Sequence, residues 1–349
     1  MVIMPLLLFL GICVVLLAGF PVAFSLAGTS LLFAGIGMLT GTFDPAFLSA
    51  VPNRIYGTIL NTNLHAVPMF VFMGVMLEKS RIAESLLTSM AGLFGRLRGG
   101  LGISVILVGM LLAASTGIVG ATVVTMGLLS LPTMLRAGYS PSLASGTICA
   151  TGTLGQIIPP SISLVLLGDV MSNAYQQAQL RQGVFSTQTV SVGDLFTGAL
   201  IPGLCLVCAY MIYMLAVAHF RPHMAPAAKL EDLALPPGVS AIGNVMKSLL
   251  PPLLLILAVL GSILSGAATP TEAAGVGALG ASLLALFSGQ LNYAVFREVS
   301  LSTVKVTAMV FMILIGAAIF SLVFRGFGGD VIVEDLFRDM PGGVVTATI

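Results

Sequence analysis

The sequence has no tryptophan and very little charge: only 8% of its 349 residues are Asp, Glu, Lys or Arg, and three are His. Hydrophobic residues make up 57% of the chain, and the mean hydropathy is +1.09. Soluble domains carry about a quarter of charged residues, so this composition excludes a soluble fold. The net charge of +1 comes with no basic run, and nothing indicates a nucleic-acid partner.

Long stretches contain no charge at all, and each is long enough for the roughly 20 residues of a membrane-spanning helix. Apolar runs without strict alternation argue against a membrane barrel, so an all-α polytopic membrane protein is predicted. The N-terminal run lacks a basic region and a cleavage site, and it is interpreted as the first span. The uncharged runs are 1–43, 99–135, 137–168, 195–220, 248–271 and 306–324.

Residues for catalysis or metal binding are scarce. His219 and His223 lie four apart, but Pro222 interrupts the helix and no third ligand is near, so no metal site is predicted. The motifs G-x-S-x-G and H-E-x-x-H are absent, and no membrane run holds two carboxylates, which argues against an enzyme. The cysteines lie in apolar runs and are interpreted as small hydrophobic residues, despite one C-x-x-C: Cys13, Cys149, Cys205 and Cys208.

Eight helical spans are predicted, and the run 99–135 is predicted to hold either two short spans or a hairpin that enters and leaves on the same side. Lys and Arg counts set the orientation: ten fall in one set of loops and four in the other, so the first set is predicted to be cytoplasmic. A Pro- and Ala-rich segment at 219–238 is the predicted cytoplasmic linker between two halves. The eight spans lie near 3–20, 22–40, 58–77, 142–168, 198–220, 248–266, 271–289 and 303–323.

A first polar cluster, "AASTGIVGAT", occupies the middle of the 99–135 run. Ser and Thr often bond to their own helix, and Gly and Ala often mark helix packing, so a structural role is one interpretation. The other is that Ser115, Thr116 and Gly117 form the turn of a hairpin within the membrane. Such a turn exposes backbone groups that need partners.

A second cluster, "CATGTLGQIIPPSISL", covers residues 149–164. Pro159 and Pro160 lack amide hydrogens and clash with the preceding turn, so a helix cannot run through them unbroken. A simple proline kink is the alternative. Freed carbonyls at this depth require a cavity, other protein or a bound ion, and oxygen ligands suit Na⁺ while the next helix start suits an anion.

Glu272 is a lone carboxylate near a span, which often indicates function. However, Thr269, Pro270 and Glu272 have the spacing of a capping box with proline at the first helical position, so a structural role is predicted. Ala273, Gly277 and Ala281 follow one turn apart and indicate a helix-packing face.

Five ordered segments carry a family resemblance: "PMFVFMGVMLEKSRIAESL", "AASTGIVGATVVTMGLLSLPTMLRAGYSPSLASG", "TLGQIIPPSISLVLLGD", "VGDLFTGALIPG" and "TPTEAAGVGALGA". They resemble the large membrane subunit, DctM-like, of tripartite ATP-independent periplasmic (TRAP) transporters. The resemblance implies an inverted-repeat ion-transporter fold, in which each repeat has a re-entrant hairpin and a discontinuous helix. The expected domains are 1–218 with the first repeat (hairpin 99–135, broken helix 142–168), a linker 219–247, and 248–349.

In that family, the hairpin tip and the helix break together bind Na⁺ next to the substrate. The resemblance therefore implies two sets of ion- and substrate-binding residues. At the hairpin tip these are Ser115, Thr116, Gly117 and Thr122. At the helix break they are Gly152, Thr153, Gln156, Pro159 and Pro160. The tip reads Ser-Thr-Gly-Ile where Ser-Gly-Ser is commoner in the family.

Family members continue with a second hairpin and a second broken helix, so the chain is expected to contain an incomplete second repeat. The resemblance implies Na⁺-coupled import of organic anions, carboxylates such as C4-dicarboxylates, across the bacterial inner membrane, without a cofactor. The implied partners are a periplasmic binding protein, a small four-helix membrane subunit and membrane lipid. The alternatives are a stand-alone H⁺-coupled carrier or antiporter of this fold, or a truncated membrane protein that does not transport.

Overall fold

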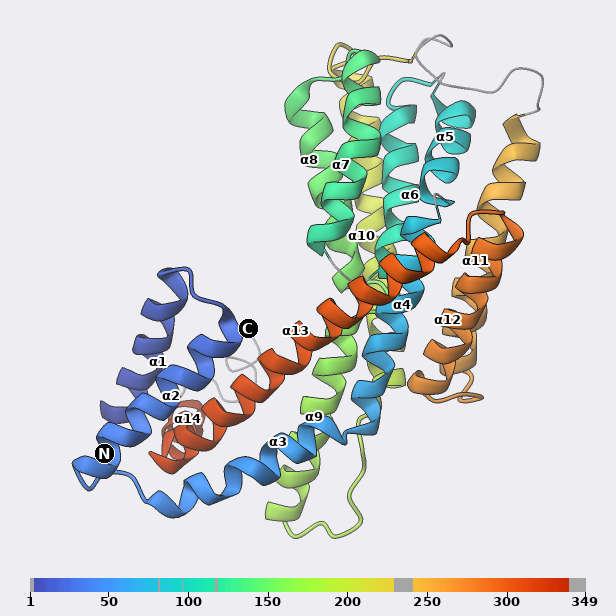
Figure 1. The fold of residues 1–349 in the computed structure, drawn as a ribbon. Coiled ribbons are helices and arrows are strands. Elements are labelled where there is room, and N and C mark those ends of the chain that lie inside the picture. The colour runs from blue at the N-terminus through green and yellow to red at the C-terminus, as the bar shows by residue number, and fades with distance from the viewer. Residues whose placement is uncertain (1–2, 81, 96, 117–118, 229–240, 339–349) are drawn as a thin grey trace. The chain divides into compact units, whose positions relative to one another are not determined.

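The computed structural model describes residues 3–80, 82–95, 97–116, 119–228 and 241–338. Every regular element in these ranges is a helix, which confirms the predicted all-α class (Figure 1). The chain divides into two compact units. Unit 1 combines Met1–Asn61 with Lys305–Ile349, and unit 2 is Thr62–Val304. The predicted domains follow the repeats expected from the family resemblance, not the compactness of the units, and they stay a prediction.

The helix bounds are as follows. Unit 1 contains α1 (Ile3–Leu17), α2 (Val22–Leu39), the 3-10 turn η1 (Pro45–Ala50), α3 (Val51–Ile59) and α14 (Gly329–Arg338). Unit 2 contains η2 (Thr62–His65), α4 (Ala66–Lys79), α5 (Ile82–Phe94), α6 (Gly100–Thr116), α7 (Val119–Arg136), α8 (Pro141–Thr153), η3 (Leu154–Gln156), α9 (Ile162–Arg181), α10 (Val192–Phe220), α11 (Ala241–Leu264) and α12 (Pro270–Phe287). Helix α13 (Tyr293–Gly326) contributes to both units.

Four described helices, α2, α10, α12 and α13, are each long and apolar enough to cross a membrane, and the helix pair over 45–79 counts as a fifth candidate. Five further described helices are apolar but shorter, among them the two halves of the 99–135 run. Helices are what such sequences must form in lipid, because each backbone amide then finds its carbonyl within the same segment. The chain is therefore a multi-pass membrane protein.

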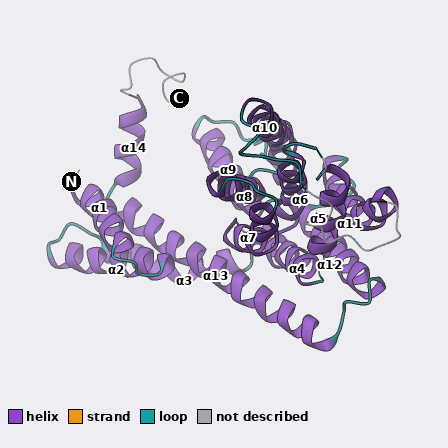
Figure 2. Cartoon of the chain, turned by 90° about the horizontal axis from the view of Figure 1, so that it is seen from above, coloured by secondary structure: helices purple, strands orange, loops and turns teal. Residues whose placement is uncertain are grey.

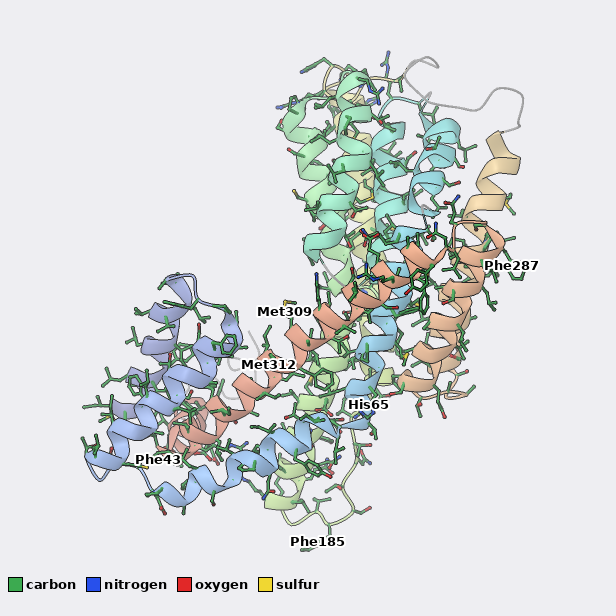
Figure 3. All side chains as sticks on the ribbon, viewed as in Figure 1. Phe43, His65, Phe185, Phe287, Met309 and Met312 are labelled. Carbon is green, nitrogen blue, oxygen red and sulfur yellow. The ribbon has the colours of Figure 1, made fainter. Side chains whose placement is uncertain are left out.

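The core of unit 1 is aromatic. Phe43, after α2, packs against Phe327, after α13, with ring centroids 5.0 Å apart, and both are nearly buried. Helices α2 and α13 also approach closely at Gly316, where an added Cβ would lie 2.5 Å from the Ala23 carbonyl oxygen. Figure 3 labels Phe43 in this region. Glycine at position 316 thus sets how closely the two backbones can pack.

The core of unit 2 is formed where α5, α6, α7, α8 and α10 meet, and Figure 2 looks down on these helices. Helix α12 packs against α4 through small side chains. Ala273, Gly277 and Ala281 are buried there, and a Cβ on Gly277 would lie 2.6 Å from the Met73 sulfur. The predicted packing face of α12 is confirmed.

Three basic loops of unit 2 lie at one end and are hydrogen-bonded to one another. The Gly99 amide donates to the Ala225 carbonyl at 3.0 Å, and the Ser140 amide donates to the Met224 carbonyl at 3.1 Å. Beside them Tyr139 is buried, its hydroxyl accepts from the Gly102 amide at 3.3 Å, and burial raises its pKa. These loops belong to the predicted cytoplasmic set, so their shared end agrees with the predicted sidedness.

The continuous helix predicted at 58–77 is wrong. Helix α3 ends at Ile59 and α4 begins at Ala66, after the 3-10 turn that ends at His65 (Figure 3). Polar contacts explain the interruption: the Thr62 carbonyl accepts a hydrogen bond from the Thr271 hydroxyl at 3.0 Å, and Asn63 donates to Asp169 at 3.3 Å. The Thr271 side chain of α12 thus satisfies a backbone carbonyl that a continuous helix would satisfy internally, and the Asn63–Asp169 bond links the turn to α9.

Two predicted boundaries are also wrong. Helix α9 continues past the predicted end at residue 168 to Arg181, and α13 begins at Tyr293 rather than near 303. In both places polar residues extend an apolar helix. Hydropathy locates the part of a helix that lies in lipid, whereas the helix itself can continue into water.

The close crossing in unit 1 is testable. Gly316→Ala should lower the melting temperature, because overpacking against a backbone oxygen costs about 1–3 kcal/mol. Gly35→Ala on α2 is the matched control, since nothing lies within 4 Å of its added Cβ and alanine favours helix. Thermal unfolding in mild detergent measures both, and equal melting temperatures would contradict the packing described.

Candidate functional site

The predicted helix break is present. Helix α8 ends at Thr153, the turn η3 follows, and α9 begins only at Ile162. The bond between Pro159 and Pro160, in the non-helical part, is cis. Neither proline has an amide hydrogen to donate to a helix carbonyl, which favours the break at this point. The sequence 142–168 thus forms a discontinuous helix rather than a kinked one.

Two side chains bridge the break. The Ser161 hydroxyl donates to the Gln156 carbonyl at 2.8 Å, and it also accepts from the Leu164 amide at 3.4 Å as the N-cap of α9. The Ser163 hydroxyl donates to the side-chain oxygen of Gln156. A serine before a resumed helix is a favoured N-cap. Ser161 and Ser163 were not among the predicted site residues, although the N-cap rule could have identified Ser161.

Several carbonyls at the break keep free acceptor capacity. The amides of Ile157 and Ile158 both donate to the Leu154 carbonyl, at 3.0 and 2.8 Å. Within the described part of the chain, the carbonyls of Ile158, Pro159 and Pro160 accept no hydrogen bond from a turn or loop amide. Both prolines are buried. Unpaired carbonyls away from water are tolerated where they face a cavity or coordinate a cation.

The first half of the broken helix lies against both helices of the hairpin (Figure 1). A Cβ on Gly152 would lie 2.3 Å from a Val123 methyl and 3.3 Å from the Val123 amide nitrogen, on α7. A Cβ on Gly109 of α6 would lie 2.2 Å from the Thr151 methyl of α8. Glycine at 109 and 152 allows these helices to pack nearly backbone to backbone. The structure thus brings the break and the start of α7 together.

The predicted hairpin-tip residues are placed unequally. Thr122 is buried in the first turn of α7 and precedes Val123, the residue that packs against Gly152. Ser115 and Thr116 end α6, but their side chains lie outside the described residues, and so does Gly117. The run 99–135 does form two helices, as predicted.

The predicted residues at the break differ in their surroundings. Gly152, Pro159 and Pro160 are buried, and Gln156 is partly buried. Thr153 is exposed, and its hydroxyl donates to the Ala150 carbonyl of its own helix at 2.7 Å. The Thr153 hydroxyl oxygen can still accept or coordinate, because each hydroxyl has two lone pairs.

Polar contacts also reach the hairpin from α4. The Thr125 hydroxyl of α7 donates to the Glu78 carboxylate at 2.8 Å, and Lys79 forms an ion pair of 2.7 Å with Glu298 of α13. Glu78 and Lys79 are adjacent, so the last turn of α4 contacts a different helix through each of them. No sequence pattern indicates this arrangement, because the partners are distant along the chain.

Glu272 has the structural role that was predicted. Its carboxylate accepts from the Thr269 amide and hydroxyl, both at 2.8 Å, while its own amide donates to the Thr269 hydroxyl oxygen at 3.3 Å. Pro270 occupies the first helical position. This is the reciprocal capping box of α12, which accounts for a carboxylate at the start of an apolar helix.

Compared with known families, the chain matches one family model, "Tripartite ATP-independent periplasmic transporter, DctM component". The model matches residues 9–349. The chain belongs to this family. The DctM resemblance predicted from the sequence is confirmed, and the family is one of transport permeases rather than enzymes.

Several relatives are similar to this DctM-family chain. The C4-dicarboxylate TRAP transporter large permease protein DctM of Pseudomonas aeruginosa is 33% identical over 282 residues, 80% of this chain and 60% of the relative. The sialic acid TRAP transporter large permease protein SiaM of Vibrio cholerae is 31% identical, over 87% of this chain and 64% of the relative. The chain therefore spans less than two thirds of the length of these two relatives.

A solved structure agrees on the fold. The YdaH transporter of Alcanivorax borkumensis superposes with a TM-score of 0.56 at 16% sequence identity, over 97% of this chain and 74% of that one. At this identity the likeness concerns the fold alone. It confirms the predicted transporter fold for the DctM-family chain.

The bridge across the break is testable. Ser161→Ala should destabilise the protein by about 1–3 kcal/mol, because it removes both an N-cap and a hydrogen bond to the Gln156 carbonyl. Ser140→Ala is the matched control, since Ser140 caps α8 in the same way without spanning a break. Thermal unfolding should show the larger loss for Ser161→Ala. A loss no greater than that of the control would mean that Ser161 acts only as a cap.

Proposed function

We propose that this chain is the large membrane subunit of a TRAP transporter and imports organic anions, carboxylates such as C4-dicarboxylates, together with Na⁺. The observation that carries the proposal is the interrupted helix 153–162 packed against the start of α7. Carbonyls at such an interruption are hard oxygen ligands, and the transporter folds that use discontinuous helices coordinate Na⁺ with them.

The proposed ion site combines carbonyls of the break with the hairpin. Thr122 is buried and precedes Val123, which packs against Gly152, and in this proposal its hydroxyl joins the predicted set Ser115, Thr116, Gly117, Thr153 and Gln156 at the site. The N-terminus of α9 carries a partial positive charge that favours a nearby anion. No arginine lies within the described spans α2, α10 and α12, so a bidentate clamp from these helices does not hold the substrate.

The proposed partners are a small membrane subunit and a periplasmic binding protein, in the bacterial inner membrane, and no cofactor is proposed. The relatives' names support the partner assignment, since they describe large permeases of TRAP transporters. Their names also differ in substrate, with C4-dicarboxylate, sialic acid and ectoine among them. Substrate choice therefore needs a direct measurement.

Na⁺ binding can be measured on the chain alone. If the break holds Na⁺, the melting temperature should be higher in NaCl than in KCl or choline chloride at equal concentration. A ligand at about 100 times its Kd adds about 2.7 kcal/mol of stability. Thr122→Val should abolish the Na⁺ effect, whereas Thr147→Val should keep it, because the Thr147 hydroxyl bonds within its own helix. Identical melting temperatures in all three salts would disprove the ion site.

Coupled transport requires the assembled system. Proteoliposomes holding this chain, its small subunit and its binding protein should take up labelled succinate or sialic acid roughly tenfold faster with Na⁺ outside than with K⁺, within the range of usual coupling energies. Uptake that is unchanged when choline replaces Na⁺ would disprove Na⁺ coupling and would favour the H⁺-coupled alternative.

A further inference from the structure

A groove runs along α8 where this helix faces α10. It has a volume of about 560 Å³ and lies between α8 and α10, with Ile106 of α6 at its base. The α8 residues that line the groove come in pairs four residues apart, so they share one face of the helix. This face extends over about two and a half turns, roughly 13 Å. That lining consists of Ser142, Leu143, Gly146, Thr147, Ala150 and Thr151.

The groove wall is apolar although it contains threonines. The Thr147 hydroxyl donates to the Leu143 carbonyl at 2.7 Å, and the Thr151 hydroxyl donates to the Thr147 carbonyl at 2.6 Å. Both hydroxyls are thereby satisfied within α8, which leaves the groove few free polar groups. The Tyr210 and Tyr213 hydroxyls also line the groove, but no charged side chain does, so a carboxylate placed along α8 would lose its hydration without meeting an opposite charge.

One end of the groove is basic. Met224 lines the groove, and its amide donates to the Arg221 carbonyl at 2.9 Å, so Arg221 lies within one turn of the lining. The loops that share this end also carry Arg98 and Arg136. The described residues of these loops, 95, 97–99, 136–140 and 221–228, include no carboxylate. The groove is therefore mostly apolar along its length, and the loops at its Met224 end carry an excess of positive charge.

We propose that this groove binds one anionic phospholipid, with an acyl chain along α8 and α10 and the phosphate at the Arg221 end. Basic residues at the membrane end of an interhelical cleft are what recognises an anionic headgroup, and an apolar channel of this length suits an acyl chain. This inference is independent of the proposed transport activity.

The position of the groove gives the lipid a structural consequence. The lining ends at Thr151, one residue before Gly152, where α8 packs against α7 near the break. Tyr213 is 61% exposed on α10, and Gly146 is exposed on α8. An acyl chain between them covers these surfaces and packs the first half of the broken helix against α10.

The first test places a bulky side chain in the groove, at a position where the surrounding helices leave room for it. Nothing lies within 4 Å of a Cβ built on Gly146, so Gly146→Phe can place its ring in the groove. Gly275→Phe on α12 is the matched control, because its Cβ also meets open space. Native mass spectrometry in mild detergent with added phosphatidylglycerol should find one retained lipid on the wild type and on the control. Occupancy should fall roughly tenfold for Gly146→Phe, the loss expected when about two methylenes are no longer buried.

The headgroup is tested separately. Arg221→Gln should reduce the preference for phosphatidylglycerol over phosphatidylcholine by about fivefold, the usual contribution of one basic residue near an anionic lipid. Circular dichroism establishes that each variant is folded. Equal lipid retention by Gly146→Phe and Gly275→Phe would overturn the proposal. So would photo-crosslinking from position 213 in native membranes to a protein helix instead of lipid.

Discussion

The structure depends on one constraint, that backbone amides and carbonyls surrounded by apolar matter need partners. Almost every described segment meets it by remaining helical. The stretch 154–161 does not, and a small set of contacts compensates there: two amides converge on the Leu154 carbonyl, and the Ser161 hydroxyl links the Gln156 carbonyl to the start of α9. The carbonyls of the proline pair are left with capacity to bind something else. Local chemistry thus turns an interruption that would destabilise the fold into a place where a ligand can add stability.

A second proline pair clarifies what makes the break. Pro251 and Pro252 lie inside α11, yet the helix runs from Ala241 to Leu264 without interruption. Leucines surround this pair, whereas Gly152, Thr153, Gly155 and Gln156 precede the other. Leucine favours helix, while glycine lowers the cost of leaving it and the polar side chains offer alternative hydrogen bonds. Two prolines alone therefore do not define a discontinuous helix, and the residues before them decide the outcome.

Sequence reasoning reached the fold class, the two helices of the 99–135 run, the break and the capping box of α12, because each depends on neighbouring residues. It failed at 58–77, where the interruption is stabilised by Thr271 and Asp169, more than a hundred residues away. It also missed the contact of Glu78 with Thr125 for the same reason. The close approach of α8 to α6 and α7 at Gly109 and Gly152 needed the structure, since glycine in a membrane helix has several uses.

The last turn of α4 contacts α7 through a hydrogen bond and α13 through an ion pair. Glu78 accepts a hydrogen bond from Thr125 in a partly buried contact, whereas the side chains of the Lys79–Glu298 pair are 38% and 57% exposed. Exposed ion pairs contribute little and are screened by salt, while a partly buried hydrogen bond is affected far less. Higher ionic strength is therefore expected to weaken the Lys79–Glu298 ion pair more than the Glu78–Thr125 hydrogen bond. Helix α4 keeps a second contact with α13 through Phe72 and Phe296, whose ring centroids lie 6.3 Å apart, so the packing of these two helices does not depend on the ion pair.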